Sequence, residues 1–351
     1  MSECFVKRRS LIVLAALWLL LLLQAAGAAA SSPGADEVRG VLGLYESGGQ
    51  SVLVRENDGR LELLFGAGGI MFDNPQTYKA FQLEKTGRHS YRLLSSQYAS
   101  PHEKVTISVD PNGHGTNLTI DGQGYIRKFF GPELGQGFRI QPLMSATELR
   151  RLAQNAEPPG EEGPFLTPDL VDIVVLDGSV LLDIRYATED NFMGMALYDQ
   201  PRALLQRPAA EALVRAHHKL KQYGYGLIIH DAYRPWRVTK MFWDATPADM
   251  KVFVADPAKG SRHNRGGAVD VALYDQSTGK AINMISGYDE FSLRAYSGFA
   301  GGTTMERYQR DLLRAVMEGE GFTVYPEEWW HFDYQDWRKY PIMNTAFSEI
   351  P

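Results

Sequence analysis

A stretch rich in proline, glycine and glutamate, NAEPPGEEGPF (Asn155–Phe165), divides the 351-residue chain into two parts with different sequence patterns. Before it, short runs such as SVLVREN, RLELLF, YRLLSS, KVTISV and NLTI alternate with turn signals such as NDGR and DPNGHG. Closely spaced short strands of this kind are typical of small antiparallel barrels and sandwiches. The sequence therefore predicts a β-rich accessory domain over residues 31–145, either a small all-β barrel or a sandwich.

The part after this stretch mixes helical and extended patterns. RPAAEALVRAHHKLKQYG predicts a helix that ends before Gly224, PWRVTKMFWDA a helix with a proline at its start, and TTMERYQRDLLRAVME a helix that begins with the capping box Thr303 and Glu306. GLIIHDAYRP, VDIVVLDGSVLLDIRYA and FTVYPEEWWHFDY predict extended segments. We expect an α+β domain at residues 166–351, with a central antiparallel sheet and flanking helices. Residues 146–165, which begin with a short helix after Ser145, are predicted to be the linker.

The first thirty residues have the pattern of a secretory signal peptide. The basic residues Lys7–Arg9 precede the apolar run Leu11–Leu23, and a small-residue end follows at Ala28 and Ala30. An uncleaved anchor is the alternative, but the apolar run is shorter than the roughly 20 residues that a membrane span needs. We therefore expect a cleaved signal peptide at residues 1–30, no stable membrane span after cleavage, and a periplasmic or secreted protein.

Charge and cysteine content exclude several kinds of function. The net charge of −6 gives no basic footprint for nucleic acid. The single cysteine, Cys4, lies in the predicted signal peptide, so neither a cysteine nucleophile nor a cysteine-ligated zinc is expected in the mature chain. A G-x-S-x-G nucleophile motif is also missing, which argues against a serine hydrolase.

Two motifs, SRHNRGGAVD and PEEWWHFDY, carry the strongest chemical signal. A catalytic zinc usually takes three protein ligands and leaves one position for water, and His263, Asp270 and His331 can supply such a set. Asp270 lies in an apolar, strand-like run, where a carboxylate is costly to bury unless it is paired or bound to a metal. Gly266 and Gly267 allow the backbone to turn so that His263 and Asp270 converge.

Two further residues fit a metallohydrolase. Glu328 stands three residues before His331, and a turn or bulge in the strand could bring both side chains to one cavity. A carboxylate beside metal-bound water is the usual general base of such enzymes. Arg234, in HDAYRPWR, could face a developing oxyanion or a substrate carboxylate. The alternatives are a surface position for Glu328 and a structural salt bridge for Arg234.

Four motifs in order, LLDIRYATEDNFMG, HDAYRPWR, SRHNRGGAVDVAL and EEWWHFDY, together resemble the zinc D-alanyl-D-alanine dipeptidases, the VanX-like family of peptidase M15. The resemblance covers about Leu166 to Trp337, and GYDEFSLRAY is similar to the family's segment between the ligand motifs. It implies one zinc ion per chain and the following roles: His263, Asp270 and His331 as zinc ligands, Glu328 as catalytic base, Arg234 as the residue that steadies the transition state, and Ser261 as a substrate-binding residue.

The function implied by the resemblance is hydrolysis of the small dipeptide D-Ala-D-Ala by an exported zinc metallopeptidase. Water bound at the zinc would be the nucleophile and Glu328 its general base. Two alternatives stay open: a D,D- or L,D-carboxypeptidase acting on peptidoglycan stem peptides, and a zinc-containing cell-wall-binding module without catalysis. The β-rich domain is a candidate for contact with peptidoglycan.

Overall fold

The computed structural model of the protein describes residues 35–66, 78–94, 104–130 and 137–351. The predicted signal peptide, residues 1–30, lies outside these described residues. None of the helices in the described part of the chain is long and apolar enough to cross a membrane. The first of these helices, α2, is short and spans Ala35–Val41.

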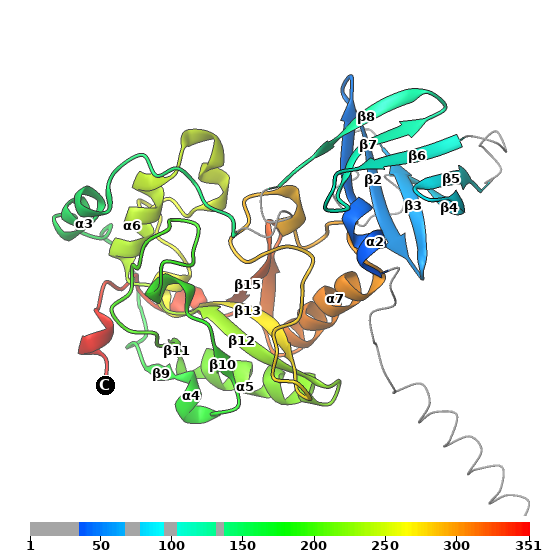
Figure 1. Ribbon diagram of the computed structural model, residues 1–351. Coiled ribbons are helices and arrows are strands. Elements are labelled where there is room, and N and C mark those ends of the chain that lie inside the picture. Colours follow the sequence, from blue (N-terminus) through cyan, green and yellow to red (C-terminus); the bar gives the residue numbers. More distant parts are fainter. Residues whose placement is uncertain (1–34, 67–77, 95–103, 131–136) are drawn as a thin grey trace, which may run out of the picture. The chain divides into compact units, whose positions relative to one another are not determined.

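A closed barrel of eight antiparallel strands follows (Figure 1). Each strand pairs with the next one along the chain, and β1 closes the barrel by pairing with β8. The structure thus decides for the barrel over the sandwich, the two architectures that the sequence pattern left open. The strands are β1 (Gly43–Ser47), β2 (Gln50–Asn57), β3 (Arg60–Phe65), β4 (Lys79–Gly87), β5 (Ser90–Leu93), β6 (Lys104–Val109), β7 (Gly115–Ile120) and β8 (Gln123–Lys128).

Alternating burial and tight turns account for the barrel strands. β6 buries Val105 and Ile107, and β7 buries Leu118 and Ile120, so every second side chain points inward. The hairpins after β2 and β7 turn at Asp-Gly pairs in which both residues have positive φ, as a type I′ turn requires. The sequence pattern misses β1, β4 and β8. In β4, for example, only Leu83 is buried, so its sequence shows no alternation.

The rest of the chain folds around a five-stranded sheet with the order β10-β12-β13-β15-β14. β10 runs parallel to β12, whereas the other neighbours are antiparallel, so the sheet is mixed and the expectation of a wholly antiparallel sheet needs this correction. A separate antiparallel pair joins β9 to β11. These strands are β9 (Leu170–Asp172), β10 (Leu181–Leu182), β11 (Leu204–Gln206), β12 (Tyr225–Asp231), β13 (Ala268–Asp275), β14 (Phe322–Tyr325) and β15 (Glu328–Tyr334).

Two extended segments differ from their prediction. FTVYPEEWWHFDY forms two strands, β14 and β15, which make a hairpin that turns at Pro326 and Glu327. VDIVVLDGSVLLDIRYA is mostly helical turns and short pieces of strand. The reason is local: the side chain of Asp172 accepts a hydrogen bond from the Val174 amide and so caps a short helix in place of a continued strand.

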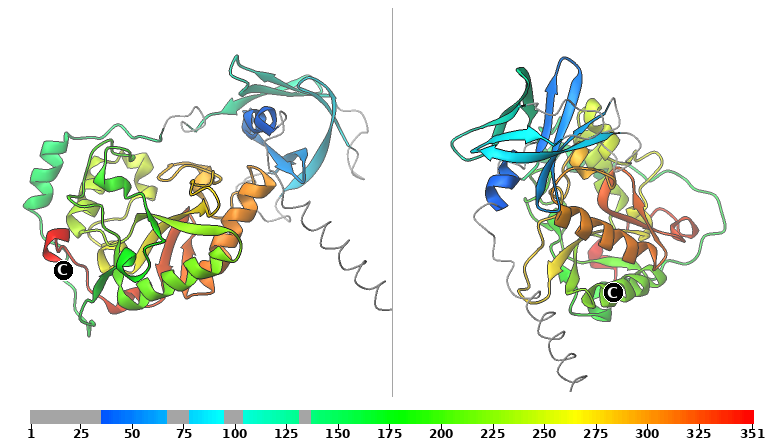
Figure 2. Two further views of the ribbon diagram at one scale, coloured as in Figure 1. Left: turned by 60° about the horizontal axis from the view of Figure 1, so that its bottom comes forward. Right: turned by 90° about the vertical axis from the view of Figure 1, so that its right-hand side faces the viewer.

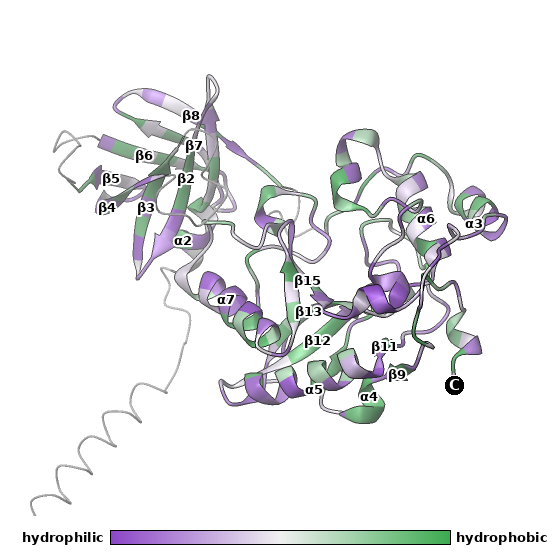
Figure 3. Ribbon diagram, turned by 180° about the vertical axis from the view of Figure 1, so that it is seen from behind, coloured by the Kyte–Doolittle hydropathy of each residue, from purple (hydrophilic) through white to green (hydrophobic). Residues whose placement is uncertain are grey.

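The predicted long helices are present and surround the sheet. α5 and α7 lie side by side and cover one face of it (Figure 2). α7 alternates polar and apolar residues along its length, while β12, β13 and β15 are mainly apolar (Figure 3). The capping box of Thr303 and Glu306 is confirmed at the start of α7. The helices are α3 (Ala146–Gln154), α4 (Ile173–Leu176), α5 (Arg207–Lys221), α6 (Trp236–Ala245) and α7 (Thr304–Glu318), with 3-10 helices η2 (Arg185–Ala187), η3 (Ala248–Phe253), η4 (His263–Arg265), η5 (Leu293–Ala295), η6 (Trp337–Lys339) and η7 (Phe347–Glu349).

The segment predicted to be a linker makes specific contacts. Helix α3 buries Leu149 and Ala153 and contacts α6. Further along, Glu161 forms an ion pair with Arg265 and accepts a hydrogen bond of 2.6 Å from the amide of Ile342. Residues 146–165 are thus attached to the α+β part through both helix packing and an ion pair. The domain boundaries themselves stay a prediction.

Candidate metal centre

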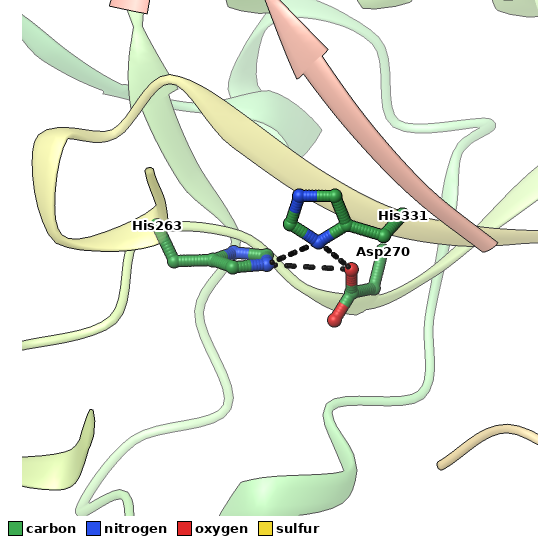
Figure 4. A group of neighbouring side chains, drawn as sticks. All are labelled: His263, Asp270 and His331. Carbon is green, nitrogen blue, oxygen red and sulfur yellow. Dashed lines mark hydrogen bonds and ion pairs between the residues drawn. The ribbon is translucent and has the colours of Figure 1, made fainter. Parts of the chain in front are cut away.

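The three predicted ligands, His263, Asp270 and His331, converge at one point (Figure 4). Nδ1 of His331 lies 3.0 Å from Nε2 of His263 and 3.0 Å from Oδ1 of Asp270. Nε2 of His263 lies 3.3 Å from the same Asp270 oxygen. All three side chains are buried. Two imidazole nitrogens and one carboxylate oxygen therefore point at a common centre.

Two glycines explain how His263 and Asp270 meet although they are close in sequence. η4, which carries His263, ends at Gly266, where φ is 61°, a left-handed conformation that glycine adopts without strain. The next residue, Gly267, lies against η6, and a Cβ on it would approach Cα of Trp337 to 2.9 Å. Because neither position tolerates a side chain, the backbone can turn from η4 straight into β13, where Asp270 is the third residue.

Strand pairing supplies the third ligand and the candidate base. Asp270 on β13 and His331 on β15 are directly paired residues on neighbouring antiparallel strands, so their side chains leave the sheet together. The pairing of β14 with β15 then jumps from Val324–Phe332 to Tyr325–Glu328, which is a bulge in β15.

The bulge places Oε2 of Glu328 3.8 Å from Nδ1 of His331. The expectation that a turn or bulge brings these two side chains to one cavity is confirmed. Trp329 and Trp330, which lie between them in the sequence, are both buried.

Arg234 is buried at the same pocket and has a structural partner as well. Its Nε donates a hydrogen bond of 2.9 Å to Oδ2 of Asp231, and its Nη2 lies 2.7 Å from that oxygen. The guanidinium also stacks over the ring of Phe242 at 4.7 Å, and Nη2 lies 3.9 Å from Oδ2 of Asp270. From the sequence, a salt bridge and a position in the pocket were alternatives for Arg234. In the structure Arg234 has both.

Ser261 lies at the pocket wall beside the first ligand. Its Oγ accepts a hydrogen bond of 3.2 Å from the amide of His263. The hydroxyl of serine can accept and donate at the same time, so its proton stays available for a group in the pocket.

The pocket also contains Asp289, a buried carboxylate that the motif analysis does not single out. The hydroxyl of Tyr186 donates to it, at 3.0 Å from Oδ1 and 2.9 Å from Oδ2. Asp289 does not stand at a characteristic spacing from the ligand motifs. The only sequence signal that could have identified it is the similarity of GYDEFSLRAY, which contains it, to a segment of the family. Aromatic side chains complete the wall, among them Phe192, Phe242 and Phe291.

Burial moves the pKa values of the pocket carboxylates in different directions. Burial raises the pKa of Glu328 to about 7; the charge of His331 opposes this shift and that of Asp270 adds to it. Burial would also raise the pKa of Asp270, but the charges and hydrogen bonds of His263 and His331 hold it well below its usual range. Burial and the charge of Asp270 raise the pKa of Asp289 well above its usual range. The pocket therefore contains one firmly ionised carboxylate at the candidate metal position and two that bind protons readily.

The donor set fits a zinc ion. Zinc in proteins takes imidazole nitrogen and carboxylate oxygen at roughly 2.0–2.2 Å in a tetrahedron, whose ligand atoms then lie about 3.3 Å apart. The distances of 3.0–3.3 Å between the three donor atoms match that spacing. Three protein ligands also leave a fourth position for water, as in catalytic zinc sites.

Fold and site together define a candidate metallohydrolase: an α+β domain in which strands β13 and β15 and the 3-10 helix η4 bring two histidines, an aspartate and a glutamate to one pocket. Residues 167–350 match the family model described as D-ala-D-ala dipeptidase, peptidase M15, and the chain belongs to this family. The resemblance of the four motifs is thereby confirmed.

Curated relatives are similar to about half of the chain. The D-alanyl-D-alanine dipeptidase of Escherichia coli (strain K12) is 36% identical over 182 residues, which is 52% of this chain and 93% of that protein. Those of Enterococcus faecium and Streptomyces coelicolor are 34% and 30% identical over 187 and 185 residues, which cover 90% and 92% of those proteins. The barrel strands precede the matched residues.

Proposed function

We propose that the protein is an exported, zinc-dependent D-alanyl-D-alanine dipeptidase with one zinc ion per chain. The convergence of His263, Asp270 and His331 in one buried cluster carries the proposal, and the family match over residues 167–350 supports the substrate class. A zinc ion bound by these three residues would supply a Lewis acid and lower the pKa of water. The other parts of the chemistry fall to side chains of the pocket.

Glu328 is the proposed general base. Its carboxylate lies next to the ligand nitrogen of His331, so it can take a proton from an attacking water and return it to the leaving amine. A pKa of about 7 suits both transfers near neutral pH. A cation bound at the centre would favour the ionised form and lower this pKa.

Charged groups on the pocket wall suit a short zwitterion. Arg234 is proposed to stabilise the negative charge that develops on the scissile carbonyl oxygen, and Ser261 to donate a hydrogen bond to the substrate. Asp289, held by Tyr186, is proposed to pair with the substrate ammonium, whose charge would draw off the proton that this buried carboxylate otherwise binds. A longer peptide would put an uncharged amide where a charge is expected, which disfavours it.

The test is hydrolysis of D-Ala-D-Ala by the mature protein, from Ser31 onward, beside L-Ala-L-Ala and a pentapeptide ending in D-Ala-D-Ala. Each substrate is assayed with and without a chelator. Fast, chelator-sensitive cleavage of the free D,D-dipeptide alone is the expected result. Cleavage of the pentapeptide would replace the proposal with a carboxypeptidase, and no cleavage by zinc-loaded protein would replace it with a binding module.

Export is proposed from the signal peptide pattern of residues 1–30. We expect the protein in the periplasm or the medium, with its N-terminus near residue 29 or 31. N-terminal sequencing of the protein recovered from these fractions checks this. Recovery of the full-length chain from the cytosol would contradict it.

A further inference from the structure

Each of the three candidate ligands makes a further hydrogen bond with the atom that does not face the common centre. Each histidine uses one ring nitrogen toward the common centre and engages the other elsewhere. Nδ1 of His263 donates a hydrogen bond of 2.6 Å to the carbonyl oxygen of Ala232. Because a carbonyl only accepts, this nitrogen carries the proton, and the lone pair of Nε2 is left for a metal.

His331 uses the opposite nitrogen, and a carboxylate determines this choice. Its Nε2 donates a hydrogen bond of 2.9 Å to Oδ1 of Asp333, so Nδ1 is the nitrogen that faces the centre and would give its lone pair to a metal (Figure 4). Asp333 lies two residues further along β15 and therefore on the same face of the strand. Its other oxygen lies 3.3 Å from Nε of Arg262, which keeps the carboxylate in place.

Asp270 has a comparable partner in Tyr288. Oδ1 of Asp270 faces both histidines, and Oδ2 accepts a hydrogen bond of 2.9 Å from the Tyr288 hydroxyl. The Tyr288 ring is held in turn by stacking on His230, with centroids 4.5 Å apart, and by an edge contact with Trp330. The hydroxyl is thus aimed at the carboxylate by packing that does not involve the ligands themselves.

We propose that Asp333 and Tyr288 are positioning residues that orient His331 and Asp270 for metal binding. The inference rests on the proposed zinc site. Partners that hydrogen-bond to the far side of a metal ligand fix its tautomer and orientation, and their loss typically weakens metal binding by about 10–100-fold. Neither residue is required to touch the substrate for this role.

The experiment measures the zinc dissociation constant of the full chain by competition with a fluorescent chelator. The variants are Tyr288→Phe, which keeps the packed ring, and Asp333→Ala and Asp333→Asn. We expect about tenfold weaker binding for Tyr288→Phe and about 10–100-fold weaker binding for Asp333→Ala. Asp333→Asn should recover part of the affinity, because its amide oxygen still accepts the proton of His331 Nε2. The absorption spectrum of the Co²⁺-loaded variants should change in the same order.

Matched controls separate positioning from general packing. Tyr274, on the same strand as Asp270, also donates one hydrogen bond of 2.9 Å, to the carbonyl of Ser179, so Tyr274→Phe removes an equivalent bond away from the ligands. Asp244 is an ion-paired carboxylate whose side chain is 16% exposed, against 15% for Asp333, so Asp244→Ala matches Asp333→Ala. Both controls should bind zinc as the parent does.

The outcomes distinguish this inference from the proposed function. A parent protein that binds no zinc overturns the metal site and this inference with it. A parent that binds zinc while Tyr288→Phe and Asp333→Ala bind it equally tightly overturns only the positioning roles. Equal weakening in the control variants would overturn them too, since the effect would then be one of packing.

Discussion

Glu328 and Asp270 show how one pocket gives two carboxylates opposite tasks. Burial raises the pKa of Glu328 to about 7, while His263 and His331 outweigh the same burial effect at Asp270 and hold its pKa well below the usual range. Groups whose environments push their pKa values apart are typical of acid–base chemistry. Glu328, which binds protons readily, lies next to the candidate metal position. Asp270, which stays ionised, is one of the candidate metal ligands.

Replacing Glu328 by glutamine should separate catalysis from metal binding. We expect kcat/KM for D-Ala-D-Ala to fall by about 10²–10⁴-fold, because an amide cannot accept the proton of the attacking water. Zinc content, measured on the same sample, should stay at one ion per chain. Glu327→Gln makes the same change one residue away and should leave turnover near that of the parent. Near-normal rates in Glu328→Gln would rule out the base role.

The raised pKa of Glu328 should also appear in the stability of the metal-free protein. A carboxyl whose pKa is raised on folding stabilises the fold below its unfolded pKa of about 4.5, and this contribution is lost as the pH rises through about 7. Glu328→Gln should therefore be more stable than the parent above pH 7, by up to roughly 3 kcal/mol, because the pKa differs by about 2.5 between the two states and each pKa unit is worth about 1.36 kcal/mol. The difference should vanish below pH 4.5. Urea unfolding followed by tryptophan fluorescence across this range measures it, and a pH-independent difference would contradict the assignment.

Among the secondary-structure elements, irregularities rather than regular strands build the site. β12 has a bulge at His230, β15 has one between Glu328 and Phe332, and η4 meets β13 through two glycines. Bulges redirect side chains that a regular strand would send to the other face of the sheet. The flanking apolar residues of these strands keep the irregular segments in place by packing in the core.

The turn between η4 and β13 offers a test at this scale. In Gly267→Ala the added Cβ would lie 2.5 Å from Cβ of Trp337 and 2.9 Å from its Cα, so the turn must move. We expect a loss of stability of about 1–3 kcal/mol, as is usual for overpacking, together with weaker zinc binding because His263 shifts relative to Asp270. Gly160→Ala, whose Cβ would meet nothing within 4 Å, is the control. Zinc affinity equal to that of the parent in Gly267→Ala would show that the turn does not set the ligand spacing.

For the whole molecule, metal binding should couple to the stability of the α+β part. A ligand that binds only the folded state at 100 times its dissociation constant adds about 2.7 kcal/mol to the free energy of unfolding. Calorimetry with zinc and with a chelator should therefore show an unfolding transition at higher temperature in zinc. His331→Ala should abolish this difference, because it removes one of three ligands. A difference that persists in His331→Ala would indicate that zinc binds elsewhere.

Much of the organisation could be predicted because it depends on local patterns. The barrel runs, the helix caps at Thr303 and Ser145, and the change of pattern after the barrel follow from turn chemistry and from the periodicity of burial, which act over a few residues. An exposed strand such as β4 carries no such signal, and the parallel pairing of β10 with β12 is not a local property of the sequence. The turn at Pro326 and Glu327, inside a run that looks continuous, was missed for the same reason.

By itself the sequence indicated the chemistry of the candidate site: Asp270 and His331 are metal-donor types that an apolar strand rarely contains without a purpose, and His263 and Glu328 stand close to them in the same two motifs. Only the tertiary structure decided which ring nitrogen of each histidine faces the centre, that Glu328 reaches it through a bulge, and that Asp289 shares the pocket. The physical reason is distance along the chain. Asp270 and His331 are 61 residues apart and meet through strand pairing, and the orientation of each depends on neighbours that no local pattern of residues brings together.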